Sequence, residues 1–170
     1  MAKKKKGIKY WDDKAWKEFS QYIRRRDSKM FLDEYPEATE GTVKCITCNN
    51  VGQAISNKRG GGMFQAGHYI SRTVKNIKYN EKNVNAQCVS CNKGLEGNRP
   101  IYISTIDIKY GDGTAHELLE LQRKYRAGDY ELMKADYYEE KYHYYKKLNE
   151  VYKMGAGDYL TQVTLEDLPF

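Results

Sequence analysis

The sequence predicts an α+β protein in which a small zinc-knuckle core is flanked by N-terminal and C-terminal α-helices. Two observations support this: all four cysteines occur in two Cys-x-x-Cys pairs, and strand-like segments lie between the pairs while helical patterns lie outside them. The 170 residues are enough for one domain, or one small core with helical arms. No apolar stretch approaches about 18 residues, so we expect no transmembrane helix and no membrane partner.

The N-terminal segment is basic and is predicted to be largely helical. Residues 1–30 carry eleven basic and four acidic side chains, and Lys3–Lys6 form a continuous run. Such a segment favours a polyanionic partner, although a solvated tail explains the lysine run equally well. Asp12 or Asp13 is expected to cap a helix. Its apolar face would consist of Trp16, Phe19 and Ile23.

The middle of the chain alternates between loops and short strands. Residues 49–62 contain four glycines and are predicted to be a loop. Met63 to Ile70 is predicted to be a strand, and a polar, basic loop over 71–82 leads to a return strand from Val84. A helix is expected from Asn92, but two nearby glycines predict that it is short.

Two further helices are predicted near the C-terminus. Thr114 and Glu117 have the spacing of a capping box, and Gly128 is a plausible end of the helix that follows. A last helix is expected over about Tyr130–Lys153, with a tyrosine-rich face. Packing against a neighbouring helix or a second subunit explains this face, and a stacking platform for unpaired bases is the alternative. The face consists of Tyr138, Tyr142, Tyr145, Leu148 and Tyr152.

The cysteines predict a structural zinc site. Cys45 and Cys48 form one knuckle, and Cys88 and Cys91 form the other. Each Cys-x-x-Cys turn places two thiolates on one side of a tight turn, so two turns complete a tetrahedron around Zn²⁺ with no open position. Two disulfides are the alternative, but a chain with no secretory signal in its N-terminal residues is expected in a reducing compartment, the cytoplasm.

The residues between and after the knuckles carry a more specific pattern. A histidine near the end of a strand (Ala66–Ser71) is followed by an asparagine on the return strand and by a second asparagine directly after the last cysteine (Asn83–Gly94). Over residues 45–98 this order resembles the His-Asn-His (HNH), or ββα-metal, nucleases. The zinc-knuckle arrangement is similar to that of phage endonuclease VII, a Holliday-junction resolvase.

A closer resemblance covers roughly residues 10–130. The matching segments are Phe19–Asp27, Ala66–Arg72, Asn83–Asn98 and Tyr110–Gly111. Together they resemble the phage NinG/Rap recombination endonucleases. The resemblance implies a phage-encoded, cytoplasmic enzyme that cuts branched DNA such as Holliday junctions and D-loops, with phage recombination proteins as partners.

The chemistry of phosphodiester hydrolysis suggests roles for these residues. His68 is predicted to be the general base, because an imidazole titrates near neutrality. Asn92 would offer an oxygen ligand to Mg²⁺ or Mn²⁺, which would stabilise the leaving 3′ oxyanion. Asn83, grouped with this catalytic set, is expected to tie the hairpin loop to the strand rather than to touch metal.

One departure from the superfamily pattern affects the metal site. Many of these nucleases carry an aspartate ligand directly before the catalytic histidine, where this sequence has Gly67. Glu96 is the candidate replacement, because on a helix it would share a face with Asn92. Asp107 and His68 itself are the other candidates.

Selectivity for branched DNA is expected to come from basic residues outside the motif. The candidate phosphate contacts are Arg24, Arg25, Arg26, Arg72, Lys75, Lys78 and Lys82. If the three arginines lay at the C-terminal end of the first helix, their positive charges would instead interact favourably with the helix dipole. A homodimer is expected, because a four-way junction has pseudo-twofold symmetry, and the helices after Thr114 would form its interface.

These interpretations divide the chain into five parts and leave three functions. The parts are a basic disordered tail (1–10), a helical arm (11–44), a zinc-stapled nuclease core (45–112), a C-terminal helical hairpin (113–153) and an acidic tail (154–170). A metal-dependent endonuclease for branched DNA is the first function. The alternatives are a general HNH nicking enzyme and a non-catalytic zinc-knuckle protein that binds nucleic acid. His68 with Asn92 favours an enzyme, since a binding protein needs neither.

Overall fold

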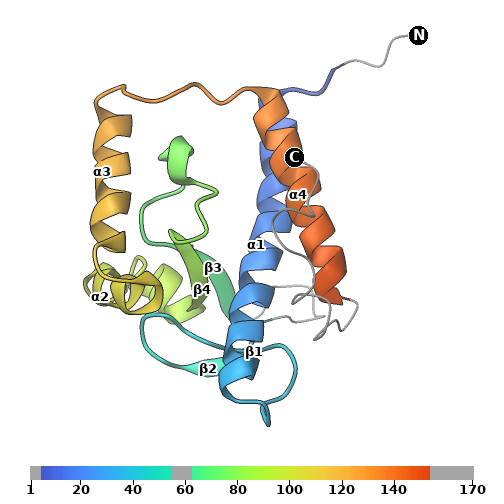
Figure 1. Cartoon of the computed structure of the whole chain (residues 1–170), viewed down its shortest axis with the longest axis vertical. Coiled ribbons are helices and arrows are strands. Elements are labelled where there is room, and N and C mark those ends of the chain that lie inside the picture. The colour runs from blue at the N-terminus through green and yellow to red at the C-terminus, as the bar shows by residue number, and fades with distance from the viewer. Residues whose placement is uncertain (1–4, 55–62, 154–170) are drawn as a thin grey trace. The chain divides into compact units, whose positions relative to one another are not determined.

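The computed structural model describes residues 5–54 and 63–153, and it confirms the α+β class (Figure 1). Lys3, Lys4, part of the predicted loop 49–62 and the predicted acidic tail lie outside the described residues. The helices and strands are α1 Ile8–Glu34, β1 Thr42–Lys44, β2 Val51–Gln53, β3 Phe64–His68, β4 Val84–Cys88, α2 Arg99–Tyr110, α3 Thr114–Arg126 and α4 Ala135–Lys153. Lys75–Ile77 form a 3₁₀ turn (η1), and Ser90–Gly94 form a single π-helical turn (η2).

The chain divides into two compact units that differ from the predicted domains. One unit contains Met1–Tyr22 and Ala135–Phe170, and the other contains Ile23–Lys134, so α1 contributes residues to both. The predicted helical hairpin over 113–153 is therefore wrong, because α3 packs with α2 in the second unit while α4 belongs to the first.

Helix α1 is longer than predicted at both ends. It begins at Ile8, so Asp12 and Asp13 lie inside it rather than capping it. It contains no glycine or proline and ends at Glu34, two residues before Pro36. Proline disfavours helical geometry in the residue before it, which accounts for this end. The arginines at 24–26 therefore lie well inside the helix, and a role at its C-terminal dipole does not apply to them.

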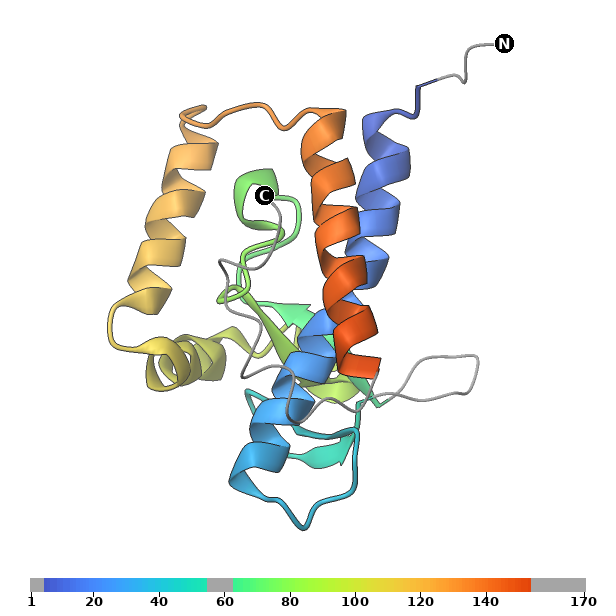
Figure 2. The same cartoon turned by 45° about the vertical axis from the view of Figure 1, so that its right-hand side comes forward.

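In the first unit, the tyrosine-rich face of α4 packs on the N-terminal part of α1. Figures 1 and 2 both show the two helices side by side. Tyr145 contacts Phe19 and Tyr22, with ring centroids 4.7 and 5.2 Å apart. Asn149 Nδ2 donates to the carbonyl of Glu18 at 2.8 Å. The tyrosine face thus packs on a neighbouring helix, although that helix is α1 rather than α3.

The second unit contains two antiparallel hairpins. β3 pairs with β4, with Phe64 opposite Cys88 and His68 opposite Val84, which confirms the predicted strand and return strand. β1 pairs with β2 around the first knuckle. This hairpin was not predicted: β1 falls in the expected helical arm and β2 in the expected loop. The two strands have only three residues each, too few for hydrophobic alternation to show in the sequence.

Helices α2 and α3 follow the second hairpin and complete its core. α2 was not predicted, because its many β-branched residues favour a strand. Its Tyr102 and Ile106, four residues apart, are fully buried against Tyr69, Ile77 and their neighbours, so tertiary packing overrides local preference.

The start of α3 differs from the predicted capping box. Thr114 is the first helical residue, and the residue before it, Gly113, has a positive φ of 88° and provides no side-chain cap. Asp107 of α2 caps the helix instead, since its Oδ1 accepts a hydrogen bond from the Ala115 N–H at 2.8 Å. Asp107 is thereby engaged in the fold, away from a metal-ligand role. Gly128 follows the end of α3 with a φ of 79°, as predicted.

A buried ionic cluster ties the C-terminal part of α1 to β4 and α2. Asp27 is 7% exposed and accepts hydrogen bonds from the Ala86 N–H at 2.6 Å and from Lys109 Nζ at 2.7 Å. Arg26 donates to the carbonyls of Glu81 and Val84 and pairs with Asp27 at 2.8 Å. These contacts fix the strand that leads into the second knuckle.

Candidate functional site

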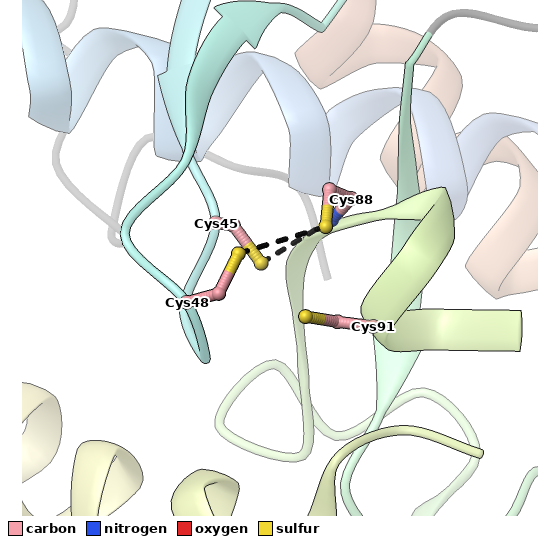
Figure 3. Close-up of side chains that lie close together, drawn as sticks. All are labelled: Cys45, Cys48, Cys88 and Cys91. Atoms are coloured by element: carbon pink, nitrogen blue, oxygen red, sulfur yellow. Dashed lines mark hydrogen bonds between the residues drawn. The ribbon is translucent and has the colours of Figure 1, made fainter. Parts of the chain in front are cut away.

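The four cysteines lie together in the second unit. Figure 3 shows Cys45 and Cys48 on the turn after β1, Cys88 at the end of β4, and Cys91 on the helical turn η2, with their sulfur atoms directed toward one another. All four Sγ atoms lie within 4.8 Å of one another, and those of Cys48 and Cys88 are 3.7 Å apart. Tetrahedral Zn²⁺ with Zn–S bonds of about 2.3 Å requires sulfur separations of about 3.8 Å.

The hydrogen bonds around Cys45 favour its thiolate, whereas burial raises the pKa of the Cys48 thiol to about 12. Cys45 Sγ lies 3.4 Å from the Thr47 hydroxyl and accepts from the Cys88 N–H at 3.3 Å. Burial opposes ionisation of Cys45, but these bonds outweigh it and lower the pKa of its thiol to about 7. Burial raises the pKa of Cys88, and the nearby Cys91 thiol acts in the same direction. A divalent cation offsets the repulsion among several thiolates, so the donor set fits zinc. In the structure all four cysteines are free thiols, and the alternative disulfides are not formed.

His68 is the last residue of β3, and its ring is held by the loop between β3 and β4. Its Nε2 lies 3.1 Å from the carbonyl oxygen of Lys78. Because a carbonyl can only accept, Nε2 carries the proton and Nδ1 is the basic nitrogen of the neutral ring. Burial lowers the pKa of the imidazole to about 4, and the charges of Lys78 and Arg72 act in the same direction. The ring is therefore neutral at physiological pH.

Asn92 lies on η2, and its side chain faces Gly67, the residue directly before His68, rather than His68 itself. Its Nδ2 donates to Gln65 Oε1 at 2.7 Å, and its Oδ1 would lie 3.2 Å from a Cβ built on Gly67. Successive residues of a strand point to opposite faces, so Gln65 and Gly67 share the face that Asn92 contacts, and the His68 side chain leaves from the other. The side chains of His68 and Asn92 are thus held by different partners, and by this alternation they leave opposite faces of β3 rather than facing each other.

Gln87 is a further polar residue at this position, and sequence reasoning missed it. It is fully buried on β4, and its Nε2 donates to the Gly97 carbonyl at 2.7 Å and to Thr47 Oγ1 at 3.1 Å. A Cβ on Gly67 would collide with its Oε1, which has no hydrogen-bond partner among the described residues. The only signal in the sequence is an amide directly before Cys88, which alternation would place on a solvent-facing side.

The structure gives Asn83 a positioning role. Its Oδ1 accepts from the Ile70 N–H at 2.8 Å, and its Nδ2 donates to the carbonyls of Ile70 and Ile77. Asn83 therefore closes the loop that carries Lys78, as expected from its place on the return strand, and its side chain is engaged away from a catalytic role.

Glu96 does not share a helical face with Asn92, as its predicted role as a metal ligand required. The turn η2 ends at Gly94, and Glu96 has a left-handed φ of 48°. Its side chain is exposed outside the helical turn, because Gly94 and Gly97 let the chain leave the helix there.

The predicted phosphate contacts separate into three groups by exposure. Arg72, Lys75 and Lys82 are exposed on the β3–β4 connection and are accessible to a phosphate backbone. Lys78 is only 7% exposed, and the side chain of Arg26 is 11% exposed and engaged by Asp27 and backbone carbonyls. These two residues serve the fold, which sequence alone did not indicate. Arg24 and Arg25 on α1 are half-buried.

A model of a known protein family matches most of the chain. The family model described as "Bacteriophage Lambda NinG protein" matches residues 1–153. The chain belongs to the NinG family. It is 25% identical over 118 residues to "Protein ninG" of Escherichia phage lambda, and 24% identical over 118 residues to "Protein ninG" of Salmonella phage P22. In each case the alignment covers 69% of this chain and 48% of the relative.

Membership of the NinG family agrees with the resemblance seen in the sequence. The alignment, however, covers only part of each relative. The chain spans about half the length of the curated NinG proteins it matches, whose names state no activity. A search of the solved structures gave no match. Within residues 5–54 and 63–153, no helix is both long and apolar enough to cross a bilayer.

Proposed function

We propose that this NinG-family protein is a zinc-stapled DNA endonuclease that hydrolyses phosphodiester bonds in branched recombination intermediates such as Holliday junctions and D-loops. The observation that carries the proposal is the state of His68: a neutral imidazole at the end of β3, with the Lys78 carbonyl fixing its tautomer. A neutral ring with a defined basic nitrogen can accept a proton, although its lowered pKa makes it a weaker base than the near-neutral imidazole expected from the sequence. The branched substrate follows from the resemblance to the NinG/Rap endonucleases.

The chain's own residues would act as follows. His68 Nδ1 takes a proton from the attacking water, and the zinc knuckle with the β3–β4 hairpin keeps the ring in position. Asn92 Oδ1 offers a hard oxygen ligand to Mg²⁺ or Mn²⁺, which, when bound, supplies positive charge for the leaving oxyanion. Arg72, Lys75 and Lys82, exposed on the same connection, would contact flanking phosphates. A homodimer would match the two strands of a junction.

Cleavage of a four-way junction tests the proposal. The wild-type protein, with Mg²⁺ or Mn²⁺, is expected to cut a junction faster than a linear duplex of the same sequence. His68→Ala should reduce cleavage at least about a hundredfold while junction binding persists, because it removes the proton acceptor, together with the hydrogen bond to the Lys78 carbonyl. His116→Ala is the matched control. His116 is exposed on α3, so this substitution should leave the cleavage rate unchanged.

A second variant separates catalysis from folding. His68→Gln can keep a donor toward the Lys78 carbonyl but cannot accept the proton, so it should also be inactive and remain folded. Equal cutting of duplex and junction would favour a general nicking enzyme. If the wild-type protein binds the junction tightly but does not cut it, the non-catalytic nucleic-acid-binding protein is the correct alternative.

A further inference from the structure

Four aromatic rings lie together in the first unit, where the N-terminal turns of α1 meet α4. The two helices run side by side in Figures 1 and 2. The ring centroid of Trp11 lies 5.0 Å from that of Tyr10, 5.6 Å from that of Tyr142 and 6.0 Å from that of His143. Tyr10 and Trp11 come from α1, and the other two come from α4. We call these four residues the aromatic group.

The aromatic group is open to solvent, unlike the rings that hold the two helices together. Tyr10 is 39% exposed, His143 is also exposed, and Trp11 and Tyr142 are half-buried. By contrast, Tyr145, which packs on α1, is 2% exposed. Packing between the helices therefore does not account for the exposed rings. Clustered exposed apolar surface of this kind marks an interaction site.

Lysine ammonium groups lie directly beside these rings. Lys6 Nζ is 5.0 Å from the centre of the Tyr10 ring. Lys14 Nζ is 5.3 Å from the centre of the Tyr10 ring and 5.1 Å from that of Tyr142, so it lies near a ring from each helix. A cation–π contact holds a flexible lysine near the ring and leaves its ammonium donors available to an anion. The rings and the positive charge thus occupy the same surface.

The positive charge continues along both helices. Asp13 is the acidic residue beside this surface on α1, and it is already paired with Lys9 at 2.7 Å. Glu139 and Glu150 are acidic neighbours on α4, but the lysines outnumber them. Besides Lys6 and Lys14, three exposed lysines lie about one helical turn from a member of this surface, namely Lys17, Lys146 and Lys147. The excess of positive charge is complementary to an anionic partner.

We propose that this surface binds unpaired nucleotides of single-stranded DNA, whose bases stack on the aromatic group and whose phosphates pair with the lysines. Every base has a flat face that stacks on an aromatic ring, and clustered positive charge follows the backbone. In a duplex the faces of each base are covered by its neighbours, so the rings favour an unpaired strand. That the strand is DNA rests on the proposed nuclease function, since a D-loop contains a displaced single strand.

Oligonucleotide binding tests the surface without relying on cleavage. Fluorescence anisotropy is measured on the zinc-loaded protein without Mg²⁺ or Mn²⁺, so that no DNA is cut. The wild-type protein should bind labelled oligo(dT) more tightly than a blunt duplex of the same length. Tyr10→Ala should weaken oligo(dT) binding at least about fivefold and leave duplex binding unchanged, because it removes a stacking ring. Tyr10→Phe keeps the ring and should bind oligo(dT) as the wild type does.

Tyr35→Ala is the matched control from the other end of α1. Tyr35 is 38% exposed, its ring centroid lies 4.8 Å from that of Phe31, and Lys44 Nζ is 6.0 Å from its centre. It therefore resembles Tyr10 in exposure, ring contact and cation–π contact, but it belongs to the second unit. Its loss should leave oligo(dT) affinity unchanged.

Lys14→Ala probes the charged part of the same surface. It should weaken oligo(dT) binding and reduce the slope of log affinity against log salt concentration by about 0.7, the value for one phosphate contact on a single strand. Lys14→Arg should restore both, because arginine keeps the charge and the cation–π contact.

The outcomes separate this surface from the nuclease function. Unchanged oligo(dT) affinity in Tyr10→Ala, or equal wild-type affinity for oligo(dT) and duplex, overturns the proposal even if junctions are cut. Tighter binding of oligo(U) than of oligo(dT) overturns the choice of DNA. Ring-dependent oligo(dT) binding by a protein that never cuts a junction supports the surface and removes the nuclease function.

Discussion

Buried amide side chains organise the residues around β4. Asn83, Asn85 and Gln87 are each 0% exposed, and each binds a different part of the second unit. Asn83 closes the preceding loop, Asn85 accepts from Lys109 and Tyr110, and Gln87 reaches Thr47 and the Gly97 carbonyl. Amides suit this task because each offers donors and acceptors without the desolvation cost of a charge. The strand that ends at Cys88 is therefore positioned by these side chains as well as by its backbone hydrogen bonds to β3.

The lowered pKa of His68 predicts an unusual pH profile. Since the ring protonates only near pH 4, cleavage should be independent of this group between about pH 5.5 and 8. The unfolded chain takes up the same proton near pH 6.5, so the contribution of His68 to stability is lost as the pH falls from about 6.5 to about 4. Single-turnover rates and the NMR titration of His68 measure both effects. An inflection at pH 6.5 in either would contradict the buried, neutral ring.

At the residue scale, sequence predicted the cysteine cluster and the strand that ends at His68 better than the contacts of individual side chains. The four cysteines and the strand ending at His68 follow from spacing and alternation alone. The roles of Gln87, Arg26 and Lys78 do not, because their partners are backbone carbonyls and side chains brought near by tertiary folding. A buried arginine and an exposed one look identical in a sequence.

At the scale of elements, the ionic cluster on α1 supports the hairpin that carries the candidate site. Asp27 lies between Arg26 and Lys109 and also accepts from the Ala86 N–H. Burial alone would raise the pKa of Asp27, but the charges of Arg26 and Lys109 outweigh it and hold that pKa below its usual value. Its stabilising effect is therefore complete above pH 3.8 and is lost as the pH falls below that value.

Asp27→Asn should destabilise the protein strongly. Asparagine can keep the bond to Ala86 but leaves two buried cations without a counter-charge, so we expect a loss of about 3–5 kcal/mol in the free energy of unfolding. Urea denaturation at pH 7 measures it. Asp33→Asn on the same helix removes the exposed pair with Lys29, and should cost less than about 1 kcal/mol. Equal effects of the two changes would show that the buried cluster contributes no more than a surface pair.

The elements that sequence failed to predict share one cause. β1 and β2 are three residues long, and α2 is rich in β-branched residues, so neither shows a clear local pattern. Both are stabilised by distant residues: Val43 packs with Phe64 and Ala86, and Tyr102 donates to the Gly67 carbonyl at 2.9 Å. By contrast, α1, α3 and the β3–β4 hairpin have patterns long enough to detect, although their ends were misplaced where a proline or a cap from another element decides them.

At the scale of the whole molecule, the two units differ in what holds them together. The second unit has two apolar clusters, a buried ionic cluster and the cysteine cluster that fits zinc. In the first unit, the described contacts are those between α1 and α4, chiefly Phe19, Tyr22 and Tyr145. Metal binding contributes directly to the folding free energy of a small unit, whereas a pair of helices is only marginally stable.

This difference predicts two unfolding transitions. Both tryptophans, Trp11 and Trp16, belong to the first unit, so tryptophan fluorescence reports its unfolding alone. Release of zinc to a chromogenic chelator reports the second unit. With rising urea, the fluorescence change should precede zinc release, because the cysteine cluster that fits zinc lies in the second unit and metal binding would add to the stability of that unit. Cys91→Ser should lower the zinc-dependent midpoint and leave the fluorescence midpoint in place. Coincident midpoints for the wild type, shifting together in the variant, would instead establish that the chain unfolds as one cooperative structure.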